Sequence, residues 1–143
     1  MRNTIFVLIL YLLICSVMDI KEKKIPVGIL YIGFIIGIVN FTLLLFCEER
    51  NYLDFIFVIM PGMILFILSK ISKGIVGEAD GLLFMISGLF FTMYQIIFLF
   101  VAAFFCSFIV SCFLLLIKKA GRKSQIPFVP FIFVSTLFVG YIK

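Results

Sequence analysis

The sequence predicts an all-α, polytopic membrane protein with about six transmembrane helices. Of its 143 residues, 65% are hydrophobic and only 13% are charged, and the mean hydropathy is +1.36. Ordinary soluble domains carry roughly 25% charged residues. An apolar run of about 20 residues can cross a hydrocarbon layer of about 30 Å. Because such runs and their short connections fill the chain, we expect a single transmembrane domain over residues 1–143.

Turn residues and charges divide the apolar sequence into six expected helices, at about 4–19, 27–46, 52–69, 77–92, 95–117 and 127–142. The first run is not followed by the small-residue cleavage site of a secretory signal, so we expect it to stay attached. Residues 81–117 carry no charge. A helix of that length, at 1.5 Å per residue, is far too long for one crossing. We therefore expect two helices there, with a turn near Thr92 to Gln95.

The basic residues predict the orientation of the helices, because Lys and Arg beside spans are retained in the cytoplasm. Three of the twelve, Arg2, Arg50 and Lys143, would lie on one side of the membrane. The other nine would lie opposite: Lys21, Lys23, Lys24, Lys70, Lys73, Lys118, Lys119, Arg122 and Lys123. We thus expect a protein of the cytoplasmic (inner) membrane with both termini outside. Since these charges serve as topology signals, the net charge of +5 does not indicate nucleic-acid binding.

The residue inventory restricts the chemistry to carboxylates. The sequence contains no His, which excludes serine triads with a His base and His-based metal sites. Its four cysteines form no CxxC pair, and three of them lie inside apolar runs, where Cys acts as a small hydrophobe. We predict no disulfide, no metal and no cofactor.

Two of the seven acidic residues, Asp19 and Asp80, directly abut predicted spans. A carboxylate at the carboxyl end of a helix or inside a membrane segment is unfavourable, so both positions call for an explanation. Two neighbouring carboxyl groups can share one proton, so that one activates a water while the other donates to a peptide carbonyl. A purely structural interpretation stays open: Asp19 could pair with Lys23, and Asp80 could cap the fourth helix.

The residues around both aspartates resemble the active-site motifs of the type IV prepilin peptidases. Asp19 is followed by a basic stretch and then by Ile25 and Pro26, as in the first motif of that family. The segment Gly77-Glu78-Ala79-Asp80 is similar to the second motif, Gly-x-Gly-Asp, which presenilin-like intramembrane proteases share.

Two further features match the same family. Gly88 corresponds to a glycine in the helix that follows the second motif, and a proline-phenylalanine segment opens the last span, with Pro127, Phe128, Pro130 and Phe131. The chain departs from the family at four positions. Val27 replaces a common Asn, Ala79 replaces the second glycine of the second motif, Leu82 replaces a common Lys, and Val129 replaces a glycine. Nothing in it resembles the methyltransferase part of longer members.

This resemblance implies an aspartic endopeptidase with Asp19 and Asp80 as catalytic residues near the cytoplasmic face. Its partners would be the lipid bilayer and a prepilin or pseudopilin, from which it would remove a short basic leader. The polar connection that contains Gly74 and Gly77 could be a mobile loop that admits the substrate, or its glycines could be ordinary turn residues. Glu22 and Glu78 would either attract the leader or be solvated loop charges.

Two other classes of function stay open at this point. The first is a non-catalytic membrane component of a pilus, secretion or competence assembly, which Ala79 favours because its methyl group restricts the backbone before Asp80. The second is a small channel or carrier with both aspartates as ion ligands, which their position near one membrane face disfavours. The sequence gives no indication of the oligomeric state.

Overall fold

The structure is a computed structural model that describes residues 2–22, 25–47, 52–72, 77–117 and 127–141. These residues form helices and turns and contain no strand. The helices are α1 (Arg2–Glu22), α2 (Val27–Phe46), α3 (Tyr52–Ile71), α4 (Glu78–Gly88), α5 (Met93–Leu116) and α6 (Val129–Tyr141). The predicted all-α membrane fold is confirmed.

Within the described part of the chain, four helices, α1, α2, α3 and α5, are each long and apolar enough to cross a membrane. By contrast, α4 has 11 residues and α6 has 13. The outer faces of the long helices carry many large apolar side chains, among them Phe46 at 87% exposure and Leu116 at 81%. So many exposed large apolar side chains are unusual for a soluble protein of this size but suit contact with lipid.

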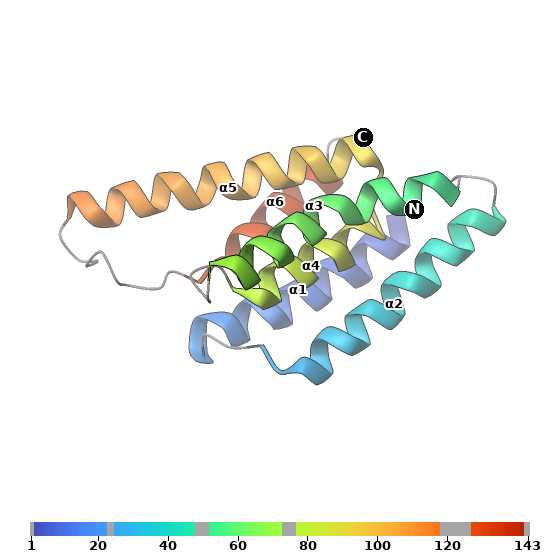
Figure 1. Cartoon of the computed structure of the whole chain (residues 1–143), viewed down its shortest axis with the longest axis horizontal. Coiled ribbons are helices and arrows are strands. Elements are labelled where there is room, and N and C mark those ends of the chain that lie inside the picture. Colours follow the sequence, from blue (N-terminus) through green and yellow to red (C-terminus); the bar gives the residue numbers. More distant parts are fainter. Residues whose placement is uncertain (1, 23–24, 48–51, 73–76, 118–126, 142–143) are drawn as a thin grey trace.

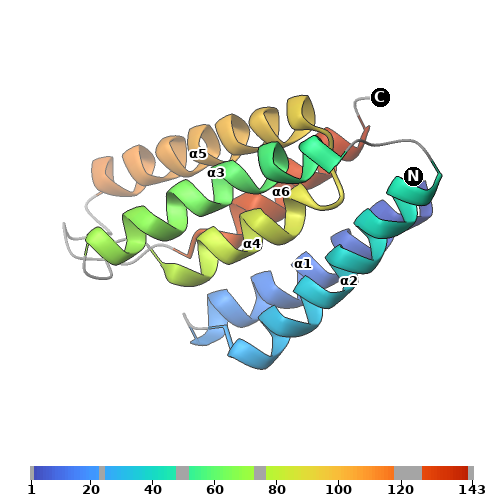
Figure 2. The ribbon, with the colours of Figure 1, turned by 45° about the vertical axis from the view of Figure 1, so that its right-hand side comes forward.

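The helices run alternately in opposite directions (Figure 1), with α4 and α6 between the α1–α2 side and the α3–α5 side of the bundle (Figure 2). Helix α1 packs mainly against α6, whereas α4 packs mainly against α3. At one end of the α1–α6 pair, Ile5 lies beside Gly140, and at the other end Asp19 reaches Val129. The start of α1 and the end of α6 therefore lie at the same end of the bundle.

The fourth helix is shorter than the predicted 77–92, and the turn before α5 comes earlier than Thr92 to Gln95. Residues 89–92 form this turn, and α5 begins at Met93. The reason is the side-chain half of a capping box: the backbone N–H and the hydroxyl of Thr92 both donate to Oε1 of Gln95, at 3.0 and 3.1 Å. Because this pair starts a helix at Met93, the turn has to precede it.

The end of α4 lies inside the bundle, where no water is at hand to bind its free carbonyl groups. Asn40 of α2 supplies a donor instead, through a buried hydrogen bond of 3.2 Å from its Nδ2 to the carbonyl oxygen of Leu89. The side chains of Leu89 and Phe91 are fully buried. Helix α2 therefore holds the α4–α5 turn in place.

Glycines bring α3 and α4 into close contact. A Cβ atom added at Gly81 would lie 2.7 Å from the backbone nitrogen of Phe66, and one at Gly88 would overlap the carbonyl oxygen of Val58. Small residues at helix contacts are the usual means of close packing in membranes, because van der Waals contact rather than hydrophobic burial holds the helices together there. These contacts fix the helix that carries Asp80.

Replacing Gly88 by Ala is expected to lower the stability of the folded protein by about 1–3 kcal/mol, as overpacking of a filled contact does. Gly28→Ala is the matched control, since a Cβ atom at Gly28 would meet nothing within 4 Å. Thermal unfolding in detergent measures the stability of both variants. A Gly88→Ala protein as stable as the Gly28→Ala protein would contradict the packing argument.

The predicted orientation can be tested by cysteine labelling from outside the cell. Cys47 is exposed at the end of α2, on the side expected to face outward. In a variant whose other three cysteines are replaced, we expect a membrane-impermeant maleimide to label Cys47 in intact cells. A cysteine introduced by Lys119→Cys, at a position outside the described residues, should be labelled only after lysis. Labelling of that cysteine in intact cells would reverse the orientation.

Candidate active site

Asp19 lies near the end of α1 and binds the start of α6. Its Oδ2 accepts a hydrogen bond of 3.1 Å from the backbone N–H of Val129, the first residue of α6, and the backbone N–H of Phe128 also donates to this carboxylate. A negative charge at the N-terminus of a helix is favourable, because the free N–H groups there carry partial positive charge. Asp19 thus acts as a cap for α6 supplied by another helix.

The sequence at the start of α6 leaves two backbone donors for this contact. Pro130, the second residue of α6, has no N–H and is tolerated in a first helical turn. The N–H of Phe131 donates to the carbonyl of Phe128, at 3.0 Å. The N–H groups of Phe128 and Val129 remain, and Asp19 accepts from both of them.

Asp80 is the third residue of α4 and forms reciprocal hydrogen bonds with Gly77, the residue that caps this helix. The N–H of Asp80 donates to the carbonyl of Gly77 at 3.2 Å, and the N–H of Gly77 donates to the Asp80 carboxylate. This arrangement is the side-chain half of a capping box. A Cβ atom at Gly77 would lie 2.8 Å from Oδ2 of Asp80, so a glycine is needed to keep the carboxylate in this position.

The structure brings the two carboxyl groups close enough to interact electrostatically. Asp19 is near the last turn of α1 and Asp80 is in the first turn of α4, and these turns lie at the same end of the bundle (Figure 1). Both side chains are partly exposed rather than sealed in the core. Two acids in this arrangement influence each other's charge, and both lie at the same end of the bundle.

Three departures from the family motifs leave these backbone contacts intact. Ala79 is a helical residue of α4 and packs partly buried against the core, so the backbone there does not need a glycine. Leu82 packs against the same core. Val129 is fully buried, yet its N–H still reaches Asp19.

The remaining motif residues shape the fold at some distance from the carboxyl groups. Ile25 is buried, and Pro26 caps α2, with its carbonyl accepting from the N–H groups of Ile29 and Leu30 at 3.0 and 3.4 Å. Gly88 lies at the far end of α4 from Asp80 and serves the contact with α3. Their function in the motifs is therefore to position helices.

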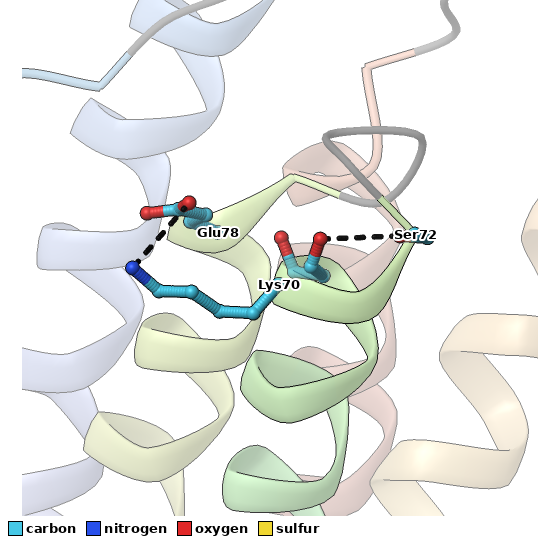
Figure 3. Close-up of polar contacts among 4 residues, drawn as sticks. Lys70, Ser72 and Glu78 are labelled. Atoms are coloured by element: carbon cyan, nitrogen blue, oxygen red, sulfur yellow. Dashed lines mark hydrogen bonds and ion pairs between the residues drawn. The ribbon is translucent and has the colours of Figure 1, made fainter.

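Glu78 forms an ion pair with Lys70 of α3, at 3.8 Å (Figure 3). Both side chains are well exposed, at 58% and 60%, and exposed pairs contribute about 0–1 kcal/mol. The Lys70 ammonium also lies 5.5 Å from the ring centroid of Phe66, and the nearby Ser72 hydroxyl donates to the carbonyl of Ser69. These contacts match solvated charges where α3 ends and α4 begins. Gly74, the other glycine of the predicted mobile connection, lies outside the described residues.

Sequence reasoning missed two polar residues on the Asp19 face of α1. Tyr11 and Cys15 precede Asp19 at intervals of four, which places all three on one side of the helix. The side chains of Cys15 and Tyr11 are hydrogen-bonded to each other, and the Tyr11 hydroxyl donates to the carbonyl of Ile29 at 3.2 Å. The four-residue spacing of polar groups in an apolar helix was the available signal. Through its hydrogen bond to Ile29, Tyr11 ties α1 to α2.

A protein-family model, the type IV leader peptidase family, matches residues 6–112 of this chain. The match covers both aspartates and stops before the proline-phenylalanine segment at the start of α6. No curated protein and no solved structure matches the chain.

Removing the Asp19 carboxyl group is expected to destabilise α6. Asp19→Ala should lower the stability by about 0.5–2 kcal/mol, the usual loss on removing a helix cap, because the donors of Phe128 and Val129 lose their acceptor. Asp19→Asn keeps an acceptor oxygen and should lose less. Thermal unfolding of both variants in detergent measures the difference, and equal stability of Asp19→Ala and wild type would contradict the capping role.

Proposed function

The chain belongs to the type IV leader peptidase family, and from this membership we propose that Asp19 and Asp80 are the catalytic pair of an intramembrane aspartic endopeptidase. Its substrates are type IV prepilin-like or pseudopilin proteins. The enzyme lies in the cytoplasmic membrane with both termini outside. It removes the basic leader of the substrate at the cytoplasmic face.

The observation that carries this proposal is the placement of the two carboxyl groups at one end of the bundle, close enough to interact electrostatically. Each group is held by backbone N–H donors, Asp19 by the start of α6 and Asp80 by Gly77. Such donors fix a carboxyl group more firmly than an exposed ion pair does. Since the chain has no His, a carboxyl pair is the acid–base system that the family's peptidase activity can draw on.

The chemistry requires one proton on the pair and one water between the two groups. The ionised carboxylate takes a proton from the water, whose oxygen then attacks the carbonyl carbon of the scissile peptide bond. The protonated carboxyl group donates its proton to the carbonyl oxygen, which gives a neutral tetrahedral diol. The pair then gives a proton to the amide nitrogen, the C–N bond breaks, and a hydroxyl proton of the diol returns to the ionised carboxylate. This releases the leader with a new carboxyl end and the new amino terminus, and leaves one proton on the pair.

The position of the pair fits a cut between a charged leader and an apolar helix. Asp19 and Asp80 lie where apolar helices end and the Lys-rich connections begin. A substrate helix that lies in the membrane beside the bundle would present its own apolar–polar boundary at the same depth. The apolar outer faces of the long helices allow such an approach through the lipid. Attraction of the leader by net charge is not required.

The structural features do not favour the two alternative functions. Ala79, which suggested a non-catalytic relative, is an ordinary helical residue, so its methyl group does not disturb the backbone before Asp80. A channel or carrier would place its ion ligands near the middle of the membrane. Here both aspartates lie near helix ends.

Asp19→Asn and Asp80→Asn should each lower substrate cleavage by at least about a hundredfold, because Asn keeps the shape of the side chain but cannot transfer the proton. Glu78→Gln is the matched control, because it also neutralises an acidic residue in the first turn of α4. Since Glu78 is an exposed charge, this variant should lose at most about tenfold of its substrate cleavage. Conversion of a co-expressed prepilin-like substrate, followed by gel shift, measures all three.

Folding of each variant is checked by its expression and thermal unfolding, since Asp19 also caps α6. Wild-type-like cleavage by a folded Asp80→Asn protein, with a substrate that requires this chain, would refute the two-aspartate mechanism. The partner-binding function would then be the better account.

A further inference from the structure

Four phenylalanine rings form a circuit of contacts that runs past the start of α6, where Asp19 binds. Phe84 of α4 contacts Phe100 of α5 with ring centroids 5.3 Å apart, and Phe100 contacts Phe104 at 4.7 Å. Phe128, directly before α6, closes the circuit, at 5.2 Å from Phe104 and 6.1 Å from Phe84. We call these four rings the aromatic cluster. Because the contacts form a closed circuit, displacement of one ring changes the surroundings of the others.

The two aspartates lie on helices that belong to different packing pairs. Asp19 is on α1, which packs mainly against α6, and Asp80 is on α4, which packs mainly against α3. The distance between the two carboxyl groups therefore depends on how the α1–α6 pair is placed against the α3–α4 pair.

Phe128 connects these two pairs through two different parts of the same residue. Its backbone N–H donates to the Asp19 carboxylate. Its ring packs against Phe84, which follows Asp80 by four residues and so lies on the same side of α4. Phe84 is fully buried, so its ring gives Phe128 a fixed surface to rest on.

We propose that Phe128 is a positioning residue, whose backbone holds Asp19 and whose ring, through the aromatic cluster, sets the separation of Asp19 from Asp80. Its importance for catalysis rests on the proposed function. Sharing of a proton and of one water is sensitive to this separation, and a misplacement of about 1 Å at a reacting group can lower a rate about a hundredfold. Phe128 does not need to touch the substrate for this effect.

Phe128→Leu tests the proposal, because it removes the ring while keeping an apolar side chain and the backbone N–H. We expect kcat per folded enzyme to fall roughly 10- to 100-fold, with KM changed by less than about twofold, since substrate binding is not affected. Phe128→Tyr keeps the ring and should recover most of the rate.

Phe133→Leu is the matched control. Phe133 is a partly buried phenylalanine of α6 that packs against the core, and its replacement should leave kcat within about threefold of wild type. A purely structural function of Phe128 would lower the unfolding temperature and the folded fraction but not kcat per folded molecule. Equal kcat values for Phe128→Leu and Phe133→Leu would overturn the proposal.

A second measurement, an NMR titration of the aspartates, does not depend on substrate cleavage. The chain contains three aspartates, Asp19, Asp54 and Asp80, so aspartate labelled with carbon-13 at the side-chain carboxyl gives three NMR signals that can be assigned by substitution. The change in the titration midpoint of Asp80 on Asp19→Asn measures the interaction between the pair. We expect Phe128→Leu to reduce this change to less than half, and Phe133→Leu to leave it intact.

The two measurements separate failure of the positioning proposal from failure of the proposed function. An undiminished Asp19–Asp80 interaction in Phe128→Leu would overturn the positioning function of Phe128, even in an active peptidase. Cleavage that persists in Asp80→Asn would instead overturn the catalytic pair. The titration would still decide whether Phe128 sets the separation of the carboxyl groups.

Discussion

The rest of the candidate site depends on the hydrogen bonds from Phe128 and Val129 to the Asp19 carboxylate. The free N–H groups at the start of α6 need an acceptor, and the N–H of Val129 belongs to a fully buried residue. A single carboxylate satisfies both donors and is itself fixed by them. The same contact joins the end of α1 to the start of α6, so one acid serves both the fold and the proposed chemistry.

The need to satisfy backbone groups also explains how Asp80 is held. Helix α4 is short and ends inside the bundle, where Asn40 binds the carbonyl of Leu89 and the bonds from Thr92 to Gln95 start α5. At its other end, Gly77 and Asp80 bind each other. Helix α4 is therefore anchored at both ends and packed closely on α3 between them. A carboxyl group on such a helix has little freedom, which suits chemistry that requires a fixed separation.

The glycines of the family motifs divide into two kinds in this chain. At Gly88 a Cβ atom would overlap the backbone of α3, so this position requires glycine, and at Gly77 a Cβ atom would displace the Asp80 carboxylate. At positions 79 and 129 the chain carries Ala and Val, whose side chains pack against or within the core while the neighbouring backbone contacts persist. The motif is best understood as a set of backbone contacts, and two of its substitutions leave those contacts unchanged.

The sequence by itself determined the all-α membrane fold, because hydropathy records which segments can lie in lipid, and it marked Asp19 and Asp80, because acids beside apolar runs are costly. The sequence also contained the Thr92 and Gln95 pair that starts α5. This local signal was available, yet the predicted turn lay later in the chain than the observed one. Only the tertiary structure decided what binds Asp19, since Val129 lies 110 positions away and no periodicity links the two. The packing of Phe128 on Phe84 is equally non-local. Such contacts depend on which helices pack together, and apolar sequence alone does not specify those pairings.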